Sequence, residues 1–209
     1  MHRFYKMLSG IILACFFSWA HAAPSDDLTG LLSHIRTMQA NFSQTVKDAK
    51  GKVLNQSQGN MSMERPGKFR WNVTQPDAQL IVANNQKIWI YDAGLEQVTI
   101  RFLGKEAGET PALLLSNTNE TLAKDFQVNM STDAGVQWFV LKPKKPGSLL
   151  ETIKLGFANA QIKQMQLLDH LGHMTLIQFS HIAVNNKLSP ALFNFKAPAK
   201  VDVIDETGR

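Results

Sequence analysis

Apolar and polar positions alternate one by one along most of the chain, which is typical of half-buried β-strands. The clearest stretch follows Pro66-Gly67, where Phe69, Trp71 and Val73 fall on one face and three polar residues fall on the other. Proline presets φ and glycine tolerates positive φ, so this pair predicts a turn. Arg65 precedes the turn. A strand with two aromatic residues on one face requires a large apolar surface opposite it.

The same two-residue period predicts roughly eleven strands joined mostly by short turns. The predicted strands span 42–46, 53–64, 69–74, 80–83, 87–92, 95–102, 126–130, 136–143, 149–157, 161–169 and 173–183, and 200–204 is a candidate for a further edge strand. Short connections between successive strands indicate an antiparallel meander. Such a sheet either closes on itself or needs a cover.

Helical spacing replaces the alternation near the start of the chain. Residues 26–38 carry one apolar stripe, and Ser25 is a candidate N-cap. The stripe consists of Leu28, Leu31, Leu32, Ile35 and Met38. We expect this helix to pack on its own sheet, because its polar face carries too few basic residues for a membrane-surface helix.

Two short helical segments interrupt the strands after residue 104. Thr110-Pro111 combines an N-cap residue with proline at the first helical position and leads into a run that includes Leu114 and Leu115. Residues 119–124 form the second segment, and Ser189-Pro190-Ala191 predicts one further helical turn. Leucine-bearing helices inserted into a meander are expected to cap an open barrel end or to cover a concave face.

Residues 1–22 have the pattern of a cleaved secretory signal peptide. Arg3 and Lys6 precede an apolar run, and Ala20-His21-Ala22 matches a signal peptidase site. An alternative is lipid attachment at Cys15, but the apolar run continues beyond this residue where a polar linker would be expected. We expect one exported domain over residues 23–209, and the lack of cysteine after residue 22 suggests a bacterial envelope compartment.

Composition and motifs exclude several classes of function. Cys15 is the only cysteine, so the mature chain can form no disulfide, and without Arg3 and Lys6 it carries 20 basic and 17 acidic residues. This charge is too small and too scattered to favour nucleic-acid binding. We found no motif of a nucleophilic, nucleotide-binding or metal-dependent enzyme. His170 and His173 flank one turn, but no further ligand completes a metal site. We therefore expect no enzyme, cofactor or metal.

The combined motifs resemble the LolA family of periplasmic outer-membrane lipoprotein carriers. The resemblance is carried by 41–44, by 59–71, by Gln75-Pro76, by 88–92, by 95–99 and by the Thr110-Pro111 helix. It covers essentially the whole chain after residue 22. It implies a mainly β fold, a curved and unclosed antiparallel half-barrel of about eleven strands whose concave face is covered by the N-terminal and inserted helices as a lid.

The resemblance also implies partners and residue roles. The family receives acylated lipoproteins from the inner-membrane exporter LolCDE and delivers them to the outer-membrane receptor LolB, and we expect a monomer. The arginine matching Arg65 holds the lid shut, and the phenylalanine matching Phe69 lies at the cavity and at the exporter contact. Our hypothesis is that Arg65 latches the helices, whereas acyl chains contact Phe42, Phe69, Trp71, Trp89, Leu114 and Leu115.

Three questions stay open at this level. The strand at 87–92 has two apolar faces, Ile88/Ile90 and Trp89/Tyr91, and alternation does not say which one joins Trp71. An apolar sheet face under helices is either a filled core or a pocket. The same half-barrel could also be an anchored LolB-like receptor, or a periplasmic module that binds proteins without lipid.

Overall fold

The computed structural model describes residues 23–103, 111–116 and 122–208. In this part of the chain twelve strands form a single sheet, in the order β12-β6-β5-β4-β3-β2-β1-β11-β10-β9-β8-β7. The strands are β1 (Thr37–Lys47), β2 (Val53–Glu64), β3 (Lys68–Gln75), β4 (Gln79–Asn84), β5 (Lys87–Asp92), β6 (Gln97–Phe102), β7 (Phe126–Asp133), β8 (Val136–Pro143), β9 (Leu150–Ala158), β10 (Gln161–Asp169), β11 (Met174–Val184) and β12 (Asp202–Asp205). β7 and β12 lie at opposite edges, so the sheet is not closed.

Two antiparallel meanders meet where the first long strand pairs with the last one. β1 to β6 follow one another in the sheet, as do β7 to β11, and β1 pairs with β11 from Met38–Val184 to Lys47–Met174. The candidate edge strand is confirmed as β12, which begins two residues later than expected and pairs with β6 in the parallel direction. The mainly antiparallel, unclosed sheet therefore agrees with the fold expected from the sequence.

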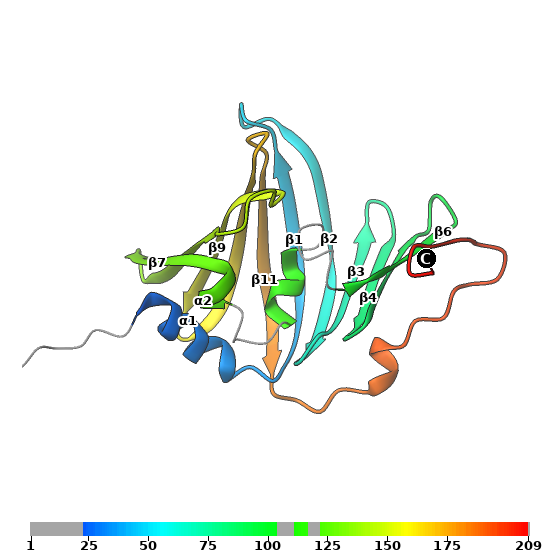
Figure 1. The fold of residues 1–209 in the computed structure, drawn as a ribbon, viewed down its shortest axis with the longest axis horizontal. Helices are drawn as coiled ribbons and strands as arrows, with labels where there is room; N and C mark the ends of the chain where they lie inside the picture. Colours follow the sequence, from blue (N-terminus) through cyan, green and yellow to red (C-terminus); the bar gives the residue numbers. More distant parts are fainter. Residues whose placement is uncertain (1–22, 104–110, 117–121, 209) are drawn as a thin grey trace, which may run out of the picture.

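The helices lie on one side of the curved sheet, apart from η4 (Pro190–Phe193) in the C-terminal segment (Figure 1). Those on the covered side are α1 (Pro24–Ser33), the 3-10 helix η2 (Pro111–Ser116) and α2 (Leu122–Asp125). We call these three segments the helical cover and the sheet face beneath them the inner face. Residues 104–110 and 117–121, which include predicted N-cap Thr110, lie outside the described residues.

The N-terminal helix is shorter than its apolar stripe predicts. It ends at Ser33, so Ile35 follows it and Met38 belongs to β1, although both side chains are buried. Strand pairing ends the helical spacing, because Thr37 already pairs with Glu64 of β2. The N-cap residue is Ala23, not Ser25, and no side chain caps this helix.

Candidate functional site: the covered inner face of the sheet

Register places the aromatic strand at the centre of a continuous apolar layer. Directly opposed residues of antiparallel strands point to the same face. One row across five strands therefore contains Met38, Met63, Phe69, Ala83 and Ile88, and the next contains Ala40, Met61, Trp71, Ile81 and Ile90. All of these side chains belong to or pack against a single hydrophobic cluster. The inner face is thus apolar from β1 to β5.

An aromatic stack within this layer crosses β2. The rings of Phe42 and Trp71 are stacked with centroids 3.6 Å apart, and the rings of Trp71 and Phe69 lie 6.0 Å apart. Phe42 reaches Trp71 across Gly59, where an added Cβ would lie 2.9 Å from Phe42 Cζ and 1.9 Å from the backbone oxygen of Asn72. This stack is possible because position 59 has no side chain.

The helical cover buries its leucines against the inner face. Leu114 and Leu115 of η2 are 8% and 1% exposed, and Leu28, Leu32 and Leu122 are also buried in the cluster. η2 contacts β2 and β3, whereas α1 contacts α2 and β7. The described part of the layer is therefore a packed core in this structure. A guest molecule would have to displace cover side chains.

The turn at residues 65–67 fastens the cover to the sheet through its backbone. The Gly67 N–H donates to the oxygen of Ser116, the last residue of η2, at 2.8 Å. The Arg65 N–H donates to the Arg36 oxygen just before β1, at 2.9 Å. Gly67 has φ +68°, and an added Cβ would lie 2.6 Å from Asn85 Oδ1, so this position requires glycine. The predicted turn is confirmed, and the Arg65–Pro66 peptide bond is cis.

The Arg65 side chain is half-buried beside this junction. Burial lowers the pKa of its guanidinium to about 10, because a charge loses hydration when it leaves water. The group stays charged at neutral pH.

Trp89 lies on the opposite face from the other proposed contact residues. It pairs with Val82 and Ile100, one position out of step with the inner rows. Its ring lies 6.4 Å from that of Phe195, in the segment after η4. The structure thus assigns Ile88 and Ile90 to the inner face. It brings Phe42, Phe69, Trp71, Leu114 and Leu115 together and leaves Trp89 out, because the C-terminal segment covers the second apolar face of β5.

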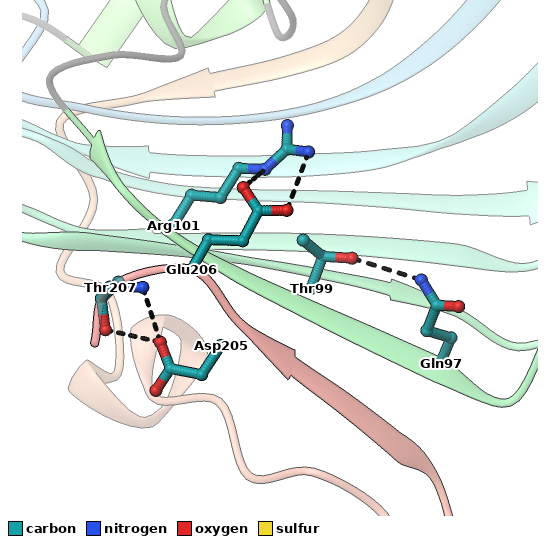
Figure 2. A network of polar contacts seen from close by, with 6 residues as sticks. All are labelled: Gln97, Thr99, Arg101, Asp205, Glu206 and Thr207. Carbon is teal, nitrogen blue, oxygen red and sulfur yellow. Dashed lines mark hydrogen bonds and ion pairs between the residues drawn. The ribbon is translucent and has the colours of Figure 1, made fainter. Parts of the chain in front are cut away.

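The inner face becomes polar at β6, a feature that the sequence interpretation missed. Thr99 and Arg101 continue the two apolar rows, and Gln97 is on the same face. Figure 2 shows Arg101 paired with Glu206, with Nε and Nη2 at 3.0 and 3.3 Å from its two carboxylate oxygens. Alternation of polar with apolar residues from 97 to 102 was the signal for this boundary. The apolar layer therefore ends at β5.

Two further features are absent from the described residues. Among them, no group of three or more histidine, cysteine, aspartate or glutamate side chains is placed to hold a metal ion. No described helix is long and apolar enough to cross a membrane.

Comparisons with known proteins agree with this architecture. The family model described as "Outer membrane lipoprotein carrier protein LolA" matches residues 33–196. The chain is 39% identical over 207 residues to the outer-membrane lipoprotein carrier protein of Pseudomonas paraeruginosa, covering 98% of this chain and 100% of that protein. It is 44% identical over 179 residues to the Legionella pneumophila protein of the same name, covering 86% of this chain and 88% of that one.

A solved structure supports the fold. The crystal structure of a LolA-superfamily protein from Nitrosomonas europaea matches with a TM-score of 0.52 at 10% identity, covering 83% of this chain and 99% of that chain. At this level of identity the similarity concerns the arrangement of strands and helices.

Proposed function

The chain belongs to the LolA family of outer-membrane lipoprotein carriers, and we propose that it carries acylated lipoproteins by burying their acyl chains between the inner face and the helical cover. Members of this family act as chaperones in the periplasm. The observation that carries the proposal is the single apolar layer shared by sheet and cover, in which Leu114 and Leu115 lie over a wall containing Phe69 and Trp71.

Free energies decide whether an acyl chain can open this layer. Burial of one long acyl chain contributes on the order of 12 kcal/mol, at about 0.8 kcal/mol per CH₂. Exposing a buried leucine costs about 1.5–3 kcal/mol, and a hydrogen bond such as that from Gly67 N–H to Ser116 contributes about 1 kcal/mol. One acyl chain can therefore replace the packing of η2, which bears Leu114 and Leu115.

Arg65 would act as the latch of this cover. Arg65 is half-buried in the turn whose Gly67 bonds to η2, and charge-assisted hydrogen bonds from a guanidinium are each worth about 1.5–3 kcal/mol. This is enough to favour the closed state of an empty carrier. It is weak enough to yield to an acyl chain.

Native mass spectrometry tests the proposal. The purified carrier is mixed with a lipoprotein bearing its acyl chains, or with the same protein whose lipidated cysteine has been replaced by serine. We expect a complex only with the acylated form. Hydrogen exchange at the Gly67 amide should accelerate in the complex, because opening the cover removes its acceptor on Ser116. Equal binding of both proteins would contradict burial of the acyl chains.

The proposed transfer partners are the exporter LolCDE and the receptor LolB. Phe69 is 0% exposed, so the contact with the exporter that the family resemblance implies requires an open cover. A photocrosslinker at position 69 should therefore react with the exporter when the helical cover is open and should not react when it is closed. Crosslinking to a closed carrier would contradict this order of events.

We also propose that the chain is exported, cleaved after Ala22 and folded as one domain. Residues 1–22 lie outside the described residues, so the support is the signal-peptide pattern of the sequence. The intact mass of the protein from the periplasm tests this directly. A mature chain that retained an acylated Cys15 would instead be an anchored receptor.

A further inference from the structure

Two hairpin tips form an exposed apex at one end of the longest strands. We call these tips the apex: residues 47–54 at the turn joining β1 to β2, and residues 169–174 at the turn joining β10 to β11, each with the strand ends beside the turn. An added Cβ on Gly172 would lie 2.9 Å from Cβ of Ala49, so the tips touch. Figure 1 shows both tips rising above the rest of the sheet, away from α1. They lie roughly 30 Å along β1 from the turn that holds η2.

Large apolar side chains are exposed at the apex. Leu171 is 75% exposed and Leu54 is 51% exposed, and Val53 and Met174 are 44% exposed each. Val53 and Met174 both pair with Lys47, so these three side chains point to the same face. Scattered exposed hydrophobic residues need no explanation, but neighbouring ones indicate a contact surface.

The apex carries three exposed lysines, all in its first tip. Lys47, Lys50 and Lys52 make no ion pair with any described residue. The Asp48 carboxylate accepts hydrogen bonds from the backbone N–H groups of Lys50 and Lys52, which turns it toward its own loop. The lysine ammonium groups are left as the outward charges.

The second carboxylate of the apex is also occupied within its own turn. Asp169 Oδ1 accepts from the N–H groups of Leu171 and His173, both at 2.8 Å, and its Oδ2 lies 2.9 Å from His173 Nδ1. Both carboxylates keep their charge, so the apex carries three lysines against two aspartates, a small positive excess whose lysine side chains are exposed. An exposed leucine tip with lysines around it has the composition of an interfacial membrane anchor.

We propose that the apex docks the protein reversibly on an anionic phospholipid surface, with Leu171 and Leu54 entering the headgroup region. Four partly exposed side chains present a few hundred Å² at most, below the roughly 800 Å² per partner of a stable protein interface, which argues against a second copy of the chain as the occupant. Nothing in this proposal depends on acyl-chain binding, so it stands apart from the proposed function.

Vesicle flotation with the purified, cargo-free protein tests the proposal. Vesicles of phosphatidylglycerol and phosphatidylethanolamine should bind it, whereas vesicles of phosphatidylcholine alone should not. Lys50→Gln with Lys52→Gln should lower the partition coefficient about thirty-fold, and Leu171→Ser with Leu54→Ser about ten-fold or more. Raising the salt from about 50 to about 500 mM should release the wild type.

Matched controls keep the test specific to the apex. Leu95→Ser alters a leucine that is 70% exposed in the turn between β5 and β6, and Lys187→Gln with Lys196→Gln removes two exposed lysines outside the apex. Both controls should bind vesicles within about two-fold of the wild type. Absence of wild-type binding, or equal losses in the controls, would overturn the proposal. So would a change of oligomeric mass in the apex variants with vesicle binding unchanged, since the apex would then bind a second copy.

Discussion

Phe42 and Trp71, from two strands that are not neighbours, stack at 3.6 Å across the glycine of the strand between them. β2 separates β1 from β3, and its residue 59 is opposite both Phe42 and Val73. The aromatic wall of the proposed acyl-chain site therefore depends on the absence of one side chain.

Gly59→Ala should destabilise the protein by more than about 2 kcal/mol, because the new methyl group meets the Asn72 backbone oxygen as well as the Phe42 ring. Urea unfolding measures the loss. Gly30→Ala is the control: no atom lies within 4 Å of its added Cβ, and alanine in helix α1 should raise stability by about 0.5–1 kcal/mol. A neutral Gly59→Ala would contradict the tight approach.

Arg65→Leu should leave the sheet folded, because the latch favours the closed position of the cover and Arg65 is only half-buried. It should nevertheless impair lipoprotein transfer between purified partners. Arg65→Lys keeps a cation but loses the planar fork, so it should impair transfer as well.

The control for these two variants is Arg36→Leu, which alters an exposed arginine near the same turn. Thermal unfolding and transfer to a receptor are measured for all three proteins. Normal transfer by Arg65→Leu would refute the latch.

Trp71→Leu and Trp89→Leu should separate the two faces of the sheet. Trp71 is on the inner face, so its replacement should weaken binding of an acylated lipoprotein or a hydrophobic probe about ten-fold or more. Trp89 packs near Phe195 on the other face, so its replacement should lower stability by about 1–3 kcal/mol and leave probe affinity unchanged. Equal effects on affinity would remove the distinction between the faces.

Glu206→Gln should loosen the edge strand β12 without altering the rest of the sheet. The Arg101–Glu206 pair is partly exposed, so we expect a loss below about 1 kcal/mol that shrinks at high salt. Hydrogen exchange of the Glu206 and Asp202 amides, which bond to β6 and its preceding turn, reports the change. Glu151→Gln, on the exposed side of β9, serves as the control. A loss that is independent of salt would point away from the ion pair.

Asp169→Asn should lower stability above about pH 4 and lose its effect in acid. Burial alone would raise the pKa of this carboxyl, but hydrogen bonds from His173 and Leu171 and the charge of His173 lower it below 3.8. A lowered pKa in the folded state means that the stabilisation is present above the unfolded value and disappears as the pH falls through the folded value. Urea unfolding at a series of pH values should show the difference between the two proteins, at most about 1 kcal/mol, vanishing in acid.

Alternation predicted most of the sheet because each strand with one buried face repeats every two residues. β2, β5, β8 and β10 have the predicted bounds. The same rule could not assign Trp89, because both faces of β5 are apolar and the second is covered by a segment about a hundred residues away in sequence, a contact that no local pattern encodes. The position of Met38 fits both the helical period of α1 and the two-residue period of β1, so its spacing alone predicted the wrong element. Its pairing with Met63 and Val184 shows that it belongs to β1.

The seam between β1 and β11 has a consequence for how the molecule folds. Asn41 pairs with Ser180, so the strand that carries Phe42 can complete its pairing only after nearly the whole chain has been made. The two meanders can form from local hairpins, but joining them closes a very long loop, which slows folding in proteins rich in such contacts. During that interval β1 presents an unpaired apolar edge, the period in which the nascent molecule is most prone to aggregate.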